Sequence, residues 1–82
     1  MGRCEKLHAR ALRNPAGLRF EELCYLAECV GFEFSRQRGS HRIYRHFELR
    51  KTISFQNHQG EGKPYQVRQL LQIIAERGGP DG

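Results

Sequence analysis

Three segments of the chain place their apolar residues at helical spacing, and each predicts an amphipathic helix. The first covers residues 3–13 and the second residues 20–30, with Gly31 positioned as the stop of the second helix. The third begins at Pro64, because a proline in the first helical turn lacks only an N–H that would be unbonded there. The apolar positions of the second helix are Phe20, Leu23, Cys24, Ala27 and Val30, and those of the third are Val67, Leu70, Leu71 and Ile74.

Between the second and third helices the hydrophobic period shortens from 3.6 residues to about two, which predicts strands. Three short runs result, at residues 32–37, 43–47 and 51–56, and their short connections favour an antiparallel meander. We expect each strand to bury the face that carries its aromatic and aliphatic residues. The expected buried pairs are Phe32 with Phe34, Ile43 with Phe47, and Ile53 with Phe55.

The order of elements predicts an α+β fold: a two-layer sandwich in which helices cover one face of a three-stranded antiparallel sheet. The αβββα part resembles a double-stranded-RNA-binding domain in topology, with an extra N-terminal helix. A chain of 82 residues is expected to form a single domain, residues 1–82. Within it we expect an N-terminal helical extension at 1–17 and a flexible tail at 78–82, and a domain this small leaves no room for a deep pocket.

Charge and cysteine content narrow the classes of function. The net charge of +5 favours a polyanionic partner, and six basic residues fall between Arg36 and Lys51 against one acid, Glu48. Three cysteines without C-x-x-C spacing, Cys4, Cys24 and Cys29, are interpreted as reduced packing residues, so neither a disulfide scaffold nor a metal site is expected. No apolar run is long enough for a membrane helix, and a cytoplasmic location is the default expectation.

The stretch from Arg38 to Arg42 holds the candidate chemistry: a glycine turn, a hydroxyl and an imidazole between basic residues. Histidine exchanges protons near neutral pH and is the commonest general acid or base, and neighbouring arginines suit a phosphate substrate. A simpler interpretation remains open, in which His41 is an ordinary surface histidine, Gly39 serves only the turn and Ser40 stabilises it.

Two stretches, Gly31–Phe34 and Arg38–His46, followed by a third strand and the segment Lys63–Leu71, resemble the HicA family of toxins. The resemblance spans residues 18–77. It implies a small toxin with a double-stranded-RNA-binding-like fold that cleaves mRNA without a metal or other cofactor. It also implies neutralisation by a HicB antitoxin, and His41 matches the family's histidine.

The resemblance and the basic hairpin together suggest roles for individual residues. His41 would act as general acid or base, and Ser40 would donate a hydrogen bond to a phosphate oxygen. Tyr44 would either stack on a base or serve as a half-buried cross-strand aromatic, while His46 and His58 are expected to be plain surface histidines. The expected RNA-binding set is Arg38, Gly39, Arg42, Tyr44, Arg45 and Lys51. The alternative function is a non-catalytic RNA-binding or adaptor module that uses the same basic hairpin.

Overall fold

The computed structural model describes residues 2–79, which form helices α1, α2 and α3 and strands β1, β2 and β3. The helices span Arg3–Arg13 (α1), Phe20–Cys29 (α2) and Pro64–Glu76 (α3); the strands span Glu33–Arg38 (β1), His41–His46 (β2) and Lys51–Gln56 (β3); a short 3₁₀ helix, η1, spans Pro15–Gly17. This order confirms the α+β class and the αβββα core with an additional N-terminal helix. Of the predicted tail, residues 80–82 lie outside the described part of the chain. Among residues 2–79, no helix is long and apolar enough to cross a membrane.

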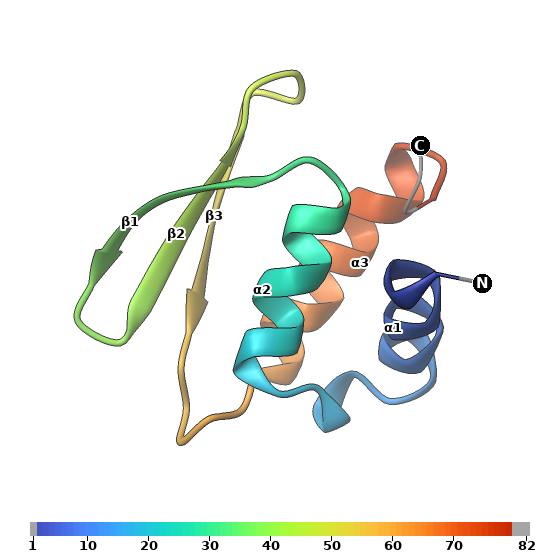
Figure 1. The fold of residues 1–82 in the computed structure, drawn as a ribbon, viewed down its shortest axis with the longest axis horizontal. Helices are drawn as coiled ribbons and strands as arrows, with labels where there is room; N and C mark the ends of the chain where they lie inside the picture. The colour runs from blue at the N-terminus through green and yellow to red at the C-terminus, as the bar shows by residue number, and fades with distance from the viewer. Residues whose placement is uncertain (1, 80–82) are drawn as a thin grey trace.

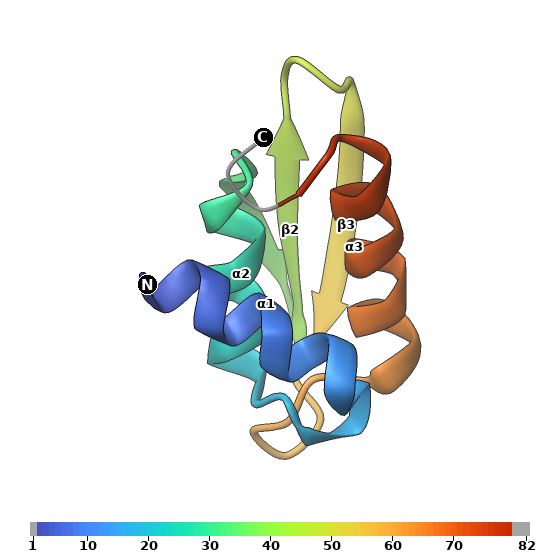
Figure 2. The same ribbon diagram turned by 90° about the vertical axis from the view of Figure 1, so that its right-hand side faces the viewer.

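The sheet is antiparallel in the order β1-β2-β3, and helices α2 and α3 cover one of its faces (Figure 1). Helix α1 lies on the far side of these two helices, away from the sheet (Figure 2). No described element covers the opposite face of the sheet, which we call the open face. The molecule therefore offers a free sheet surface on one side and the additional helix on the other.

The hydrophobic core lies between the sheet and the helix pair, with a smaller contribution from α1. Burying a large apolar side chain contributes about 1.5–3 kcal/mol, so this cluster is the main source of stability. Helix α1 joins it through Leu7 and Ala11. The larger contributors are Phe20, Leu23, Leu26, Phe32, Tyr44, Ile53, Phe55, Val67, Leu70 and Ile74.

The expected burial was wrong for Phe34, which is 54% exposed, and for the face of β2 that carries Ile43 and Phe47. Tyr44 and His46 are buried, whereas Ile43 is half-buried and Phe47 is 64% exposed. In the register of the sheet, Tyr44 lies opposite Ile53, which faces the helices, and residues directly opposite share a face. The apolar character of Ile43 and Phe47 therefore predicts the wrong face of β2. The amphipathic rings of Tyr44 and His46 occupy the inner positions instead.

His46 is a buried structural residue, not the surface histidine that was expected. Its ring Nε2 lies 3.0 Å from the carbonyl oxygen of Val30, and its Nδ1 accepts a hydrogen bond from the backbone N–H of Leu49 at 3.2 Å. Because Nδ1 is the acceptor, Nε2 carries the proton and donates to Val30. Gly31, with φ +99°, leaves the space for this ring, since an added Cβ would lie 2.7 Å from Nε2.

The cysteine prediction was wrong for two of the three residues. Cys4 and Cys29 form a disulfide that joins the first turn of α1 to the last turn of α2, with Cα atoms 5.9 Å apart. Cys24 is a free, buried packing residue, as expected. A salt bridge between Arg10 and Glu22 also joins α1 to α2. The pairing depends on how two helices pack, and sequence spacing carries no information about that.

Candidate RNA interface and active site

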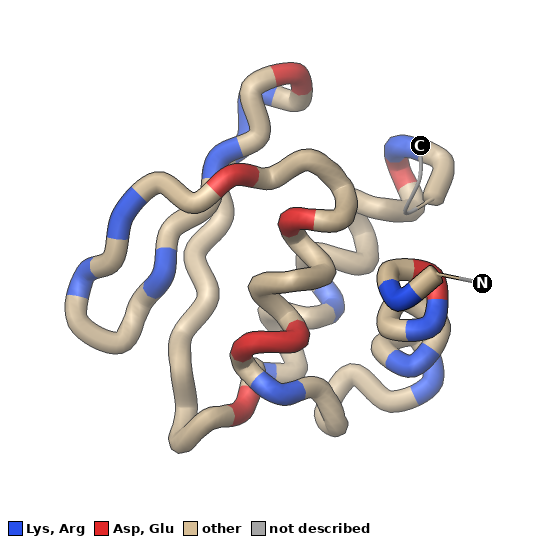
Figure 3. The backbone as a smooth tube through the Cα atoms, in the orientation of Figure 1, with Lys and Arg blue, Asp and Glu red and all other residues tan. Residues whose placement is uncertain are grey.

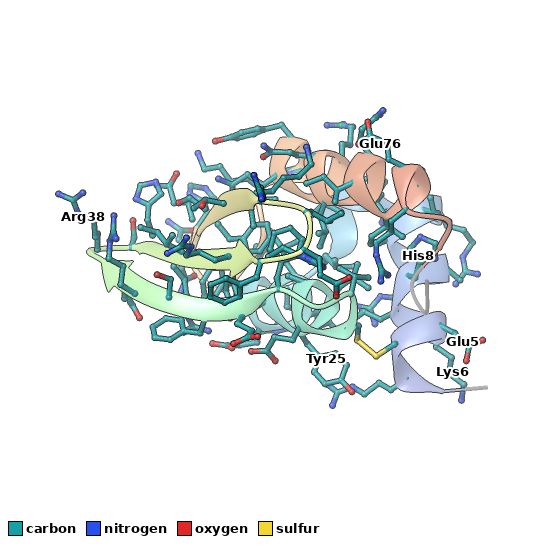
Figure 4. All side chains as sticks on the ribbon, turned by 90° about the horizontal axis from the view of Figure 1, so that it is seen from above. Glu5, Lys6, His8, Tyr25, Arg38 and Glu76 are labelled. Atoms are coloured by element: carbon teal, nitrogen blue, oxygen red, sulfur yellow. A yellow bond between two sulfur atoms is a disulfide. The ribbon has the colours of Figure 1, made fainter. Side chains whose placement is uncertain are left out.

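The hairpin between β1 and β2 turns over Gly39 and Ser40 and places His41 at the first position of β2. Gly39 has φ +59°, in the left-handed region, and an added Cβ there would meet nothing within 4 Å. A glycine of positive φ at the first position of a two-residue loop is typical of a type II′ turn. Gly39 is therefore needed for backbone conformation, and Arg38 projects from the tip of the hairpin (Figure 4).

A β-bulge in β1 decides which face carries its arginines. Phe34 lies opposite Tyr44, whereas Arg36 lies opposite Ile43, so Ser35 is an extra residue in the register. One extra residue reverses the alternation of side chains along the rest of a strand. Arg36 is thereby placed on the open face, whereas an unbroken strand would put it on the inner face with Phe34.

His41 lies on the open face between its two strand neighbours. It pairs with Arg38 on β1 and with Gln56 on β3, and its side chain is exposed. No side chain within residues 2–79 forms a hydrogen bond or ion pair with its ring. The ring is therefore accessible to a bound molecule, and Ser40 is exposed beside it.

The backbone around His41 is held by groups on β3, the following loop and α3. The carbonyl oxygen of Ser40 accepts a hydrogen bond from the N–H of Asn57 at 2.8 Å. Gln56, directly opposite His41, donates its N–H to Oε1 of Gln66 at 2.9 Å. The Gln66 side chain is buried, and its Nε2 donates to the Tyr65 hydroxyl at 3.3 Å. Gln66 thus satisfies the backbone N–H of Gln56, the residue of edge strand β3 that lies opposite His41.

A basic groove occupies the other end of β2. It has a volume of about 410 Å³ and includes Arg45, Arg50 and Lys51 in its lining. Five residue steps along β2 separate His41 from His46, which corresponds to about 17 Å of extended strand. Basic side chains therefore occur at both ends of the sheet, and Arg36 and Arg38 extend them to the hairpin tip.

Three residues of the expected RNA-binding set have the register of the inner face instead: Tyr44, Arg42 and Lys51, of which Lys51 lies opposite His46 and is exposed at the start of β3. Tyr44 is 2% exposed and packs among Phe34 and Phe55, so it serves as a cross-strand aromatic and offers no surface to a base. Burial, together with a hydrogen bond to Cys24, raises the pKa of its hydroxyl. Arg42 is half-buried, and its Nη1 donates to Glu21 Oε1 at 3.1 Å.

The guanidinium of Arg42 is already satisfied within the fold. It lies 4.8 Å from the centre of the Phe20 ring. Burial acts to lower its pKa, but the hydrogen bonds to Glu21 and Tyr44 outweigh that effect, and the pKa is raised. Arg42 therefore links β2 to α2, which is a structural role.

Charge is segregated between the elements (Figure 3). Glu21, Glu22 and Glu28 lie on α2, while lysines and arginines are concentrated on the hairpins and α1. Sequence reasoning left Arg36, Arg50 and Phe47 out of the candidate site. The signal for the two arginines was their place in the basic stretch, but nothing in the pattern showed which face they occupy. Within the described residues, no group of three or more His, Cys, Asp or Glu side chains is placed to hold a metal ion.

The fold and the site define a small α+β protein whose open, basic sheet face carries an exposed histidine at a hairpin. A sequence model of the HicA toxin of bacterial toxin-antitoxin systems matches residues 20–75. The match covers more than half of the chain, so the chain belongs to the HicA toxin family. Comparisons with curated proteins and with solved structures found no match. The matched region begins at α2, so α1 and its disulfide partner Cys4 lie outside it.

Proposed function

We propose that this protein is the toxin of a type II toxin-antitoxin system and acts as a metal-independent endoribonuclease on mRNA. Membership of the HicA family supports the toxin class, and the accessible ring of His41 on a basic sheet face supports RNA cleavage. In this proposal residues 18–77 form the functional core and residues 1–17 form an added extension. The single observation that carries the proposal is the exposed, unpaired imidazole of His41.

The proposed reaction uses the ribose 2′-hydroxyl as the nucleophile. His41 takes the proton from this hydroxyl, the 2′-oxygen forms a bond to phosphorus, and the bond from phosphorus to the 5′-oxygen breaks. The departing 5′-oxygen receives a proton from water, and His41 releases the proton that it took from the 2′-hydroxyl to solvent before the next turnover. The products are a 2′,3′-cyclic phosphate and a 5′-hydroxyl. Ser40, exposed beside His41, donates a hydrogen bond to a phosphate oxygen.

The basic side chains of the open face and of the basic groove at its end would position the RNA backbone. Arg38 lies directly opposite His41, and Arg45 and Lys51 line the groove at the far end of the sheet. Contacts with phosphates fix the position of the RNA on the protein, and they do not depend on the RNA sequence. Arg36 joins this set, since the bulge places it on the same face.

The proposed protein partner is a HicB-type antitoxin that covers the basic face. An acidic partner would associate rapidly with this surface, and the association would weaken as salt is added. The proposed location is the cytoplasm, where mRNA is available. No small-molecule cofactor is part of the proposed reaction.

A second candidate function is a non-catalytic RNA-binding or adaptor module. It is favoured by one observation: within residues 2–79 no second acid or base contacts the ring of His41. His46 is buried and His58 lies in the loop after β3. In this alternative, His41 would be one contact among several on the basic face.

Replacement of His41 separates the two functions. We expect His41→Ala to lower the cleavage rate of purified RNA by about 10²–10⁴-fold, the usual contribution of a general acid or base. The fold and the antitoxin complex should be unchanged, because the side chain is exposed. His58→Ala, another exposed histidine, serves as the matched control, and a chelator should not affect cleavage. Unchanged cleavage by His41→Ala would reject its catalytic role, and binding without cleavage by the wild-type protein would favour the adaptor module.

A further inference from the structure

Phe47 is a large apolar side chain that an ordered turn exposes to solvent. It is 64% exposed, and it follows β2 in the four-residue turn that leads to β3. Within the same turn, Leu49 is half-buried and packs against the core. The apolar position that the fold can bury in this turn is therefore already occupied, and Phe47 contributes its ring to the surface.

The turn that carries Phe47 is fixed by specific contacts. The buried ring of His46 accepts a hydrogen bond from Leu49, and the N–H of Arg50 donates to the carbonyl oxygen of Phe47 at 3.3 Å. Arg50 has φ +53°, a left-handed conformation that is strained for any residue other than glycine. Strained backbone conformations cluster at functional sites, so the strain at Arg50 is a reason to examine the function of this turn.

Two grooves meet at Phe47. One has a volume of about 160 Å³ and is lined by Glu33, Phe34, Ser35, Arg45 and Phe47. The other is the basic groove, in which Phe47 lies with Arg45, Arg50 and Lys51. The guanidinium carbon of Arg45 lies 5.3 Å from the centre of the Phe47 ring, so this cation stacks on the aromatic surface. The site therefore presents an aromatic ring beside a concentration of positive charge.

We propose that Phe47 is a stacking platform for one base of a bound RNA strand, with Arg45 beside the base and Arg50 and Lys51 on the adjoining phosphates. This inference rests on the proposed RNA substrate and extends it to a base-binding subsite. A nucleotide carries a flat aromatic base next to an anionic phosphate, which matches an exposed ring next to a basic groove. The subsite takes the stacking role that Tyr44 is too deeply buried to perform.

The subsite and His41 are placed so that one continuous RNA chain could contact both. The subsite lies at the end of β2, and His41 lies at its beginning, about 17 Å away along the strand. A strand of RNA that follows the open face would therefore contact both. Stacking would hold the RNA at one end of the sheet while the phosphodiester bond is cleaved at the other.

The first test replaces the ring. The probe is a short 2′-O-methyl oligoadenylate, which lacks the free 2′-hydroxyl and stays intact during binding. Loss of one base–aromatic stack corresponds to about a 5- to 150-fold rise in Kd, so Phe47→Ala should weaken binding within this range and Phe47→Tyr should restore it. Leu12→Ala is the matched control, because Leu12 is 58% exposed on α1. Inorganic polyphosphate has phosphates but no base, and Phe47→Ala should bind it as wild type does.

The second test separates stacking from charge and uses Arg50→Gly. Glycine adopts positive φ without strain, so this variant should unfold at a higher temperature than wild type. It should nevertheless bind both oligoadenylate and polyphosphate more weakly, and the slope of log K against log salt should become shallower by about 0.7. A gain in stability with a loss of affinity is the expected signature of a residue that is strained to hold a ligand.

Three outcomes would overturn the subsite. Equal RNA affinity for Phe47→Ala and Leu12→Ala would show that the ring takes no part in binding. Weakened antitoxin binding with unchanged RNA binding would show that Phe47 serves a protein partner. Wild-type protein that binds no RNA would overturn both the subsite and the proposed function. If instead His41→Ala still cleaves RNA while Phe47→Ala loses affinity, the catalytic assignment fails and the subsite stands.

Discussion

The disulfide between Cys4 and Cys29 gives the most direct quantitative prediction about stability. The two residues are 25 positions apart, and the bond closes the chain from the first turn of α1 to the last turn of α2. In the chain-entropy description, a cross-link over a loop of this length lowers the entropy of the unfolded chain and stabilises the fold by about 3.5 kcal/mol. A domain of this size has a total unfolding free energy of roughly 4–12 kcal/mol, so the cross-link accounts for a large share.

The perturbation is Cys4→Ser, and the measurement is unfolding by guanidinium with and without a thiol reductant. We expect the variant to lose about 3.5 kcal/mol of unfolding free energy, and its thermal midpoint to fall by on the order of 15–25 °C. Reductant should lower the stability of wild-type protein to a similar level. It should have no effect on Cys4→Ser, because Cys24 is then left with only Cys29, which lies one helix turn or more away on the same helix.

The same experiment tests whether α1 supports the site. The disulfide lies on the far side of α2 and α3 from the sheet, and in Figure 4 Lys6 on α1 and Arg38 on the hairpin lie at opposite ends of the molecule. At a temperature where Cys4→Ser remains folded, its RNA binding should therefore equal that of wild type. Wild-type protein whose unfolding is the same with and without reductant would contradict the assigned cross-link. Lost RNA binding in the folded variant would contradict the independence of α1 from the open face.

Three further substitutions test a buried hydrogen bond and two glycines of positive φ. Gln66→Leu should lower the unfolding free energy by about 1–3 kcal/mol, because the N–H of Gln56 loses its acceptor, and guanidinium titration measures this loss. RNA cleavage should also slow, since Gln56 lies opposite His41, the residue proposed to be catalytic. Gly31→Ala should destabilise more than Gly39→Ala: both glycines have positive φ, but an added Cβ meets the His46 ring at 2.7 Å only at Gly31. Equal thermal midpoints for the two alanine variants would show that the His46 ring moves aside without cost.

Local patterns were sufficient to predict most of the fold. The helical period predicted α1 over residues 3–13, and Pro64 marked the start of α3 as observed. Strand β3 also matches its predicted range, 51–56, and Gly31 follows the end of α2 with the positive φ that a helix stop requires. These features depend on residues that are near one another in the chain, which is why periodicity and turn chemistry reveal them.

The errors all concern contacts between distant segments. The disulfide depends on how α1 packs against α2, and the burial of His46 depends on the carbonyl of Val30 and on the space at Gly31. The inner face of β2 is decided by the register with β3 and by two residues, Tyr44 and His46, whose rings are apolar but whose edges are polar. A single-sequence pattern contains none of this information.

The bulge at Ser35 shows why the site was harder to predict than the fold. Without it, the even-numbered residues of β1 would all share the face of Phe34, and Arg36 and Arg38 would point toward the helices. With it, Phe34 keeps its contact with Tyr44 while both arginines join His41 on the open face. One unpaired residue therefore allows the same strand to supply an aromatic contact to the inner face and positive charge to the outer face. The basic surface proposed to bind RNA thus depends on a local departure from regular alternation. Deletion of Ser35 should remove the bulge and leave these charges on the open face, because Arg36 would then follow Phe34 directly and stay opposite Ile43.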